Sequence, residues 1–92
     1  MAQVCTVVQA DPWTLASTLD AYTSGVLVAE KTSSSGKFII VSDDSLPSQT
    51  FVVIAGDPDK LANAITDLIT GGATIELIIP TFSASHYVVA YI

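Results

Sequence analysis

Three ionisable side chains interrupt segments that are otherwise apolar, and these residues are the best placed to do chemistry. Glu30 and Glu76 lie 46 residues apart, each within an apolar stretch, and His86 is the only histidine. Two neighbouring carboxylates can act as a general acid and a general base, and an imidazole titrates near neutral pH. If the protein is an enzyme, we expect Glu30, Glu76 and His86 to be its catalytic groups. The interpretation that we favour places each glutamate at a solvent-facing position of a strand.

Two further segments carry residues that often take part in catalysis or phosphate binding. Ser33–Lys37 shares a Gly-Lys pair with phosphate-binding loops, but the required upstream glycine is replaced by Lys31 and the required Ser or Thr by Phe38. We therefore interpret this segment as a hairpin turn. Cys5 is the only cysteine and cannot form a disulfide within the chain, so we expect it to be a small core residue.

The acidic residues do not have the spacing of a metal site. Asp43 and Asp44, together with Asp57 and Asp59, could approach a calcium ion, but the spacing of a twelve-residue EF-hand loop is not present. We therefore interpret these residues as parts of a solvated linker and of a helix cap. We expect no metal and no cofactor.

Net charge disfavours one class of partner and leaves others open. The chain has nine Asp and Glu residues, three lysines and no arginine, which gives a net charge of −6. Because phosphate backbones are held chiefly by Lys and Arg, we expect no binding to nucleic acid. No apolar run approaches the ~20 residues of a membrane-spanning helix, and the N-terminus lacks a signal peptide pattern. We therefore expect no membrane association and a cytoplasmic or virion-associated location.

The chain consists of two copies of one unit, residues 1–46 and 47–92, within a single domain. The residues that recur at a spacing of 46 positions lie where a strand, a helix start, a helix face and a helix stop need them. They are Val7 and Val53, Asp11 and Asp57, Pro12 and Pro58, Leu15 and Leu61, Ala16 and Ala62, Gly25 and Gly71, and Glu30 and Glu76.

Each copy is predicted to be a strand, a helix and two further strands. An apolar run (4–8 or 51–55) leads to an Asp-Pro pair that caps and begins a helix, and Gly25 or Gly71 should end that helix. The next strands are expected at 26–31 and 37–42 in the first copy, and at 73–79 and 86–92 in the second. We expect the second hairpin turn, 80–85, to be the longer one, with the spacing between the copies slipping by about three residues there. Residues 43–50 should link the copies.

These elements predict an α+β fold in which two βαββ repeats form one mostly antiparallel sheet with two helices on one face. The pattern is related to ferredoxin-like topology by analogy only. Several strands are apolar at consecutive positions, which is typical of a sheet covered on both faces. Two helices on one side leave the other side bare, so we expect a homo-oligomer formed through apolar strand faces. Trp13, which has Asp59 as its counterpart, is the first candidate for a contact surface.

The sequence favours a non-enzymatic, self-associating structural or assembly protein. Half of its residues are apolar and only 13 % are charged, compared with about a quarter in typical soluble domains. A component of a virus particle or a similar shell fits this composition. The alternative is a small-molecule binding protein or an enzyme of the dimeric α+β-barrel type, in which Glu30, Glu76 and His86 would be the polar groups of a pocket.

Overall fold

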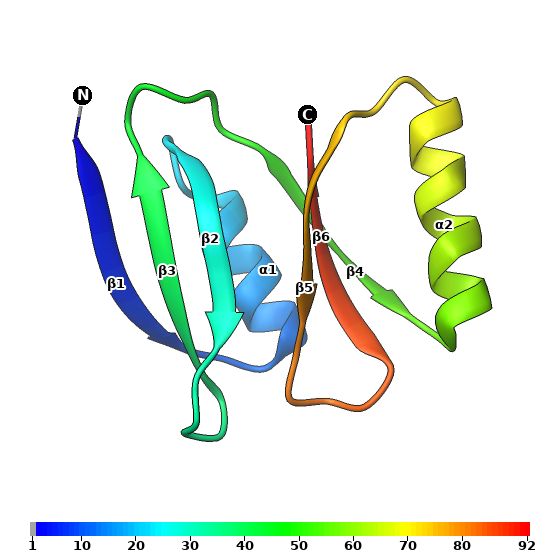
Figure 1. Cartoon of the computed structure of the whole chain (residues 1–92), viewed down its shortest axis with the longest axis horizontal. Coiled ribbons are helices and arrows are strands. Elements are labelled where there is room, and N and C mark those ends of the chain that lie inside the picture. The colour runs from blue at the N-terminus through cyan, green and yellow to red at the C-terminus, as the bar shows by residue number, and fades with distance from the viewer. Residues whose placement is uncertain (1) are drawn as a thin grey trace.

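Figure 1 shows the computed structural model of the protein, which describes residues 2–92. The elements along the chain are β1 (Gln3–Gln9), α1 (Pro12–Asp20), β2 (Gly25–Lys31), β3 (Lys37–Asp43), β4 (Thr50–Ala55), α2 (Pro58–Thr70), β5 (Ile75–Pro80) and β6 (His86–Tyr91). Each half of the chain therefore contains a strand, a helix and two further strands. The α+β class and the two βαββ units predicted from the sequence are confirmed.

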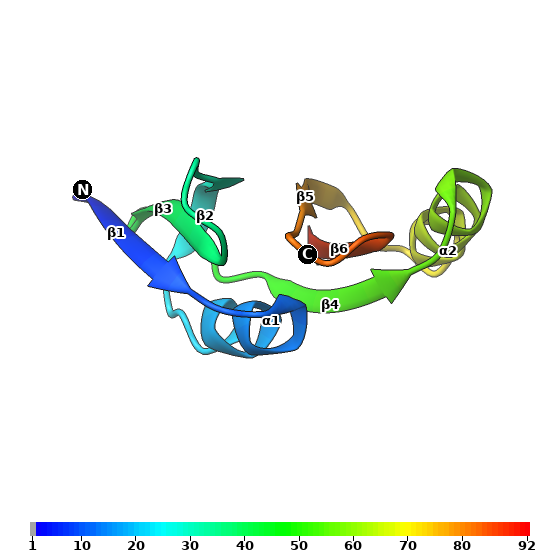
Figure 2. The same ribbon diagram turned by 90° about the horizontal axis from the view of Figure 1, so that it is seen from below.

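The six strands form two separate sheets, whereas the sequence predicted one. The first sheet has the order β1-β3-β2 and the second β4-β6-β5, with every neighbouring pair antiparallel. In both sheets the last strand of the repeat is central, so each repeat completes its own hydrogen-bonded ladder. The edge strands β2 and β5 lie next to each other where the two sheets meet, but they are not hydrogen-bonded as neighbouring strands (Figure 2).

Helix α1 lies between the two sheets and builds the core with both of them (Figure 2). The helix begins at Pro12, because Asp11 Oδ1 accepts a hydrogen bond from the Thr14 backbone N–H at 2.7 Å and proline suits the first helical position. Its buried residues pack in one cluster with residues of β2 and β3 on one side and of β4, β5 and β6 on the other. This cluster includes Leu15, Ala16 and Leu19 with Val26, Ala29, Phe38 and Ile40, and with Phe51, Ile79, Val88 and Ala90.

Helix α2 begins in the same way but buries none of its residues. Asp57 Oδ1 accepts a hydrogen bond from the Lys60 backbone N–H at 2.9 Å, and Pro58 is the first helical residue. The helix contacts β4 of its own repeat and lies on the far side of the second sheet from α1 (Figure 1). The expectation of two helices on one face is therefore wrong. The sheets follow one another along the molecule, so only α1 has a sheet on both sides.

The spacing between equivalent residues changes from 46 to 49 between the helix start and the second strand, and not at the second hairpin turn as the sequence predicted. Cys5 of β1 pairs with Val41, and Phe51 of β4 makes the equivalent pair with Ala90. Residues of β1 and β4 therefore correspond at a spacing of 46. A bulge in β2 places Val28 opposite Val41, and a bulge in β5 places Leu77 opposite Ala90, which is a spacing of 49 for these strands. The second helix is four residues longer, with 13 residues where α1 has 9, and the segment between helix and strand ladder is one residue shorter, which gives the change of three.

Because of this change of spacing, two pairs of residues that were predicted to be equivalent are not, namely Gly25 with Gly71 and Glu30 with Glu76. Gly71 is the C-cap of α2, but α1 ends at Asp20 with Ala21 as its C-cap, and Gly25 is the first residue of β2. Glycine is required there for a different reason, since a Cβ atom would lie only 2.6 Å from Leu46 Cβ and 2.8 Å from the Pro47 carbonyl oxygen. Glu76 lies at the bulge of β5, at a spacing of 49 from Leu27 rather than from Glu30.

The two hairpin turns have the same length, and their threonine hydroxyls make the same hydrogen bonds. Each turn has five residues, 32–36 or 81–85, so the prediction of a longer second turn is wrong. The Thr32 hydroxyl donates to the Lys37 carbonyl at 3.0 Å, and the Thr81 hydroxyl donates to the His86 carbonyl at 2.7 Å. Both turns end on a residue with positive φ, which is 78° at Gly36 and 59° at Ser85. The two hairpins are thus equivalent in length and in the bonds of their threonine hydroxyls.

Candidate assembly interface

The face of the second sheet that receives α1 is a complete helix-on-sheet contact. Side chains alternate between the two faces of a strand, so the strand pairings identify which residues share this face. They are Phe51 and Val53 of β4, Val88 and Ala90 of β6, and Leu77 and Ile79 of β5. All of these side chains belong to the core cluster or pack against it. We call this the covered face.

The equivalent face of the first sheet has similar apolar residues but no cover within residues 2–92. By the same pairings it consists of Cys5 and Val7 of β1, Ile39 and Val41 of β3, and Val28 and Glu30 of β2, so that Glu30 is its one charged residue. Val7 is 64 % exposed, Ile39 39 % and Val28 37 %. Cys5 is also exposed, so the prediction that it is a core residue is wrong. Its strand is apolar, but its thiol lies on the face of the sheet that no other element within residues 2–92 covers. We call this the open face.

The apolar side of α2 is likewise uncovered. Leu15, Ala16 and Leu19 of α1 are buried. Their counterparts Leu61 and Ile65 are only partly buried and Ala62 is exposed, although the residue types are almost the same. Farther along α2, Ile69 is 55 % exposed. An apolar helix stripe normally packs against another element, so both ends of the molecule present half of a helix-on-sheet contact.

A buried glutamine joins the two repeats at the edge of β2. Gln49 Oε1 accepts from the Val26 backbone N–H at 2.8 Å, and Gln49 Nε2 donates to the Val26 carbonyl at 3.0 Å. The same Nε2 donates to Glu76 Oε1 at 2.9 Å. The amide group thus continues the ladder at the edge of β2. Gln49 was not predicted to be a functional residue, although Gln3 and Gln49 are a further identical pair at the spacing of 46.

A carboxylate makes the second polar contact between the repeats. Asp20, the last residue of α1, accepts a hydrogen bond from the Phe51 backbone N–H through Oδ1 at 3.1 Å. This bond connects the end of α1 to β4 of the following repeat. Together with Gln49, it fixes how one repeat is placed on the next.

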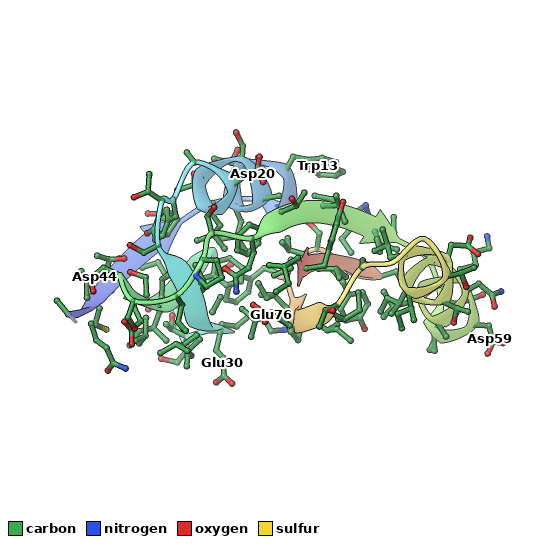
Figure 3. All side chains as sticks on the ribbon, turned by 90° about the horizontal axis from the view of Figure 1, so that it is seen from above. Trp13, Asp20, Glu30, Asp44, Asp59 and Glu76 are labelled. Atoms are coloured by element: carbon green, nitrogen blue, oxygen red, sulfur yellow. The ribbon has the colours of Figure 1, made fainter. Side chains whose placement is uncertain are left out.

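The two glutamates proposed as a catalytic pair have different surroundings. A groove of about 320 Å³ runs between β2 and β5, lined by residues 27–31 and 77–80, and Glu30 is one of its lining residues. Glu30 is exposed and points away from the ribbon, whereas the carboxylate of Glu76 lies where the two sheets meet and accepts from Gln49 (Figure 3). The structure does not bring them together as an acid–base pair.

His86 is placed with an aromatic neighbour rather than with either glutamate. Its Nδ1 lies 2.8 Å from the Ala84 carbonyl oxygen, which can only accept, so Nδ1 carries the proton. The imidazole meets the Trp13 ring edge-on, with 5.1 Å between the ring centroids. Trp13 itself is 58 % exposed. It therefore offers an aromatic surface, and its role in a contact stays a prediction.

The aspartates serve as hydrogen-bond acceptors for the chain itself. The Ser45 hydroxyl donates to Asp43 Oδ1 at 2.6 Å and the Ser45 backbone N–H donates at 2.9 Å, and these bonds lower the pKa of Asp43. Asp44 Oδ1 accepts from the Ala2 backbone N–H at 2.7 Å. Among residues 2–92, no three or more His, Cys, Asp or Glu side chains are grouped as they would be around a metal ion.

Comparison of the chain with protein-family models, curated proteins and solved structures gave no match. The ferredoxin-like analogy therefore has no support from a known structure. Within the part of the chain that the structure describes, neither helix has the length and apolar character needed to cross a membrane.

Proposed function

We propose that the protein is a non-enzymatic structural or assembly protein that associates with copies of itself. The observation that carries this proposal is the open face of the first sheet together with the uncovered helix α2. Apart from Glu30, each of them has apolar residues like those of a contact that is buried elsewhere in the same chain. Contiguous exposed apolar patches of this kind are uncommon on monomers and are typical of interaction surfaces.

The exposed apolar residues of the first sheet lie together on one face, as in an interaction surface, and are not scattered singly over the molecule. Val7, Val28 and Ile39 share one face of one sheet, and their exposure is 37 % or more. The expectation from the sequence was an interface of strand faces alone. The exposed side of α2 adds a helix to that proposed interface.

The alternative, a small-molecule binding protein or enzyme, has less support. The groove between β2 and β5 is where such a site would lie, but the three candidate groups do not converge on it. Glu30 faces solvent, Glu76 binds Gln49, and His86 contacts Trp13. Polar groups of a binding site normally point to one place. A subunit of a virus particle or similar shell would need a self-associating surface of the kind proposed.

Sedimentation equilibrium and light scattering at micromolar concentration test the proposal. We expect a mass that is a multiple of the 9.6 kDa of one chain, and a melting temperature that rises with protein concentration. A stable mass of 9.6 kDa, with a melting temperature independent of concentration, would contradict self-association.

A further inference from the structure

We propose that copies of the chain associate head to tail, with α2 of one copy packed on the open face of the first sheet in the next. This inference rests on the proposed self-association and names the two surfaces that meet. The partner is a second copy of the chain, and the contact repeats one that each chain already contains.

The contact inside the chain supplies the geometry. There, α1 of the first repeat lies against the covered face of the second repeat, with the first sheet on its other side. Because both repeats have the same strand order and the same hairpins, the step from first to second repeat can be applied again. Applied to the second repeat, this step places the first repeat of another copy against α2. The open face is the surface that then meets the helix.

The two halves of the proposed contact have the residue types of the contact that exists. On the sheet side, the positions of Phe51, Val53, Leu77, Val88 and Ala90 are taken by Cys5, Val7, Val28, Ile39 and Val41. On the helix side, Leu15, Ala16 and Leu19 correspond to Leu61, Ala62 and Ile65. The exception is Glu30 of the edge strand β2, which takes the position of Ile79. The other positions remain apolar, so α2 on the open face would bury a largely apolar surface.

Applying the same step between two copies also repeats a polar contact, that of Gln49 with Val26. Gln49 binds the N–H and C=O of Val26, and its repeat counterpart is Gln3, while the counterpart of Val26 is Ile75. Thr74 and Ile92 exchange hydrogen bonds at 2.7 and 3.0 Å. In an antiparallel ladder the next residue then turns its N–H and C=O outward, so Ile75 presents both groups at the edge of β5. Gln3 of the next copy is placed to bind them.

Head-to-tail contact uses a different surface on each partner. A symmetric contact between two α2 helices, or between two open faces, would not reproduce either the helix-on-sheet packing or the glutamine contact. A head-to-tail series closes into a ring when the rotation per copy divides a full turn, and otherwise continues as a filament.

Two substitutions test the two surfaces, α2 and the open face, one at a time. Ala62→Asp places a charge on the helix side and Val7→Lys places one on the open face, and both positions are exposed in the single chain. The matched controls are Asn63→Asp, on the same helix, and Ser33→Lys, at a hairpin tip, which are also exposed. Asn63 corresponds to Ser17, which is exposed on α1 although that helix is covered. Native mass spectrometry and sedimentation at micromolar concentration give the readout.

The expected result is that each of the two variants alone is a folded monomer, that both controls assemble like the wild type, and that an equimolar mixture of Ala62→Asp and Val7→Lys gives a 1:1 complex. Each chain in that mixture keeps one intact surface, and together they form one wild-type contact. Formation of the complex also shows that both variants are folded.

Other outcomes identify what has failed. A monomeric wild type would contradict the proposed self-association itself. An oligomeric wild type whose Ala62→Asp and Val7→Lys variants both stay oligomeric would overturn only the head-to-tail contact, and so would loss of assembly in one variant alone. Two monomeric, folded variants that form no mixed complex would also overturn it.

Discussion

Replacing Leu15 and Leu61 separately by Ala measures how differently the two repeats are packed. The two leucines are equivalent in the repeat, but Leu15 is fully buried between two sheets while Leu61 is partly exposed. Truncating a fully buried leucine costs about 3 kcal/mol, because apolar contacts are lost and a cavity remains. For a chain of 92 residues, whose free energy of unfolding is about 5–10 kcal/mol, this is a large fraction of the total. Leu61→Ala should cost about 1 kcal/mol in dilute solution.

The measurement is urea denaturation followed by far-ultraviolet circular dichroism, at the lowest protein concentration that gives a signal. The same series at high concentration then reports on assembly, since a contact that buries Leu61 raises the cost of Leu61→Ala toward that of Leu15→Ala. Equal costs for the two variants in dilute solution would refute the reasoning, because α1 and α2 would then be equally well packed in a single chain. A cost of Leu61→Ala that stays the same at every concentration would show that assembly does not cover this residue.

Three further predictions concern the connections and caps. Gln49→Ala should lower the free energy of unfolding by about 2–3 kcal/mol, because it leaves buried backbone groups without partners, whereas Gln3→Ala in dilute solution should change it by less than about 0.5 kcal/mol; urea denaturation compares them. Ser85→Gly should raise it by about 0.5–1 kcal/mol, since Ser85 has φ of 59° where the first hairpin has Gly36, and an unchanged or lower unfolding midpoint would argue against strain there. The Thr14 N–H holds the pKa of Asp11 below 3.8, so the stability that the ionised cap provides is present above this pH and lost as pH falls through the folded pKa. In Asp11→Asn the melting temperature should lose this dependence, and an identical acid profile for both proteins would count against the cap.

Local features were predictable from the sequence because they depend on residues close together in the chain. The Asp-Pro pairs begin both helices, since a carboxylate can accept the free N–H groups of the first turn and proline needs no hydrogen-bond partner there. The apolar strand runs and the hairpin between 31 and 37 were found for the same reason. The βαββ order of both repeats follows from these signals.

The spacing of the repeat could not be followed past the helices from identities alone. Gly25 and Gly71 match at a spacing of 46 but have different roles, because α2 is longer than α1 and the later strands align at 49. In strands rich in Val and Ile, a shift of three residues leaves an equally apolar pattern. Only the pairing of β2 and β5 with their neighbours, including both bulges, resolves the alignment.

The sequence by itself determined the elements, their order and the surplus of apolar surface. Only the tertiary structure decided where that surface lies. Leu15 and Leu61, or Val53 and Val7, are the same residues in equivalent places, yet one of each pair is covered and the other is not. Burial depends on what the rest of the chain brings alongside a residue, and within residues 2–92 the second repeat covers α1 while no equivalent sheet covers α2. The physical reason for the difference is therefore packing between elements far apart in the sequence, which no local pattern of residue types records.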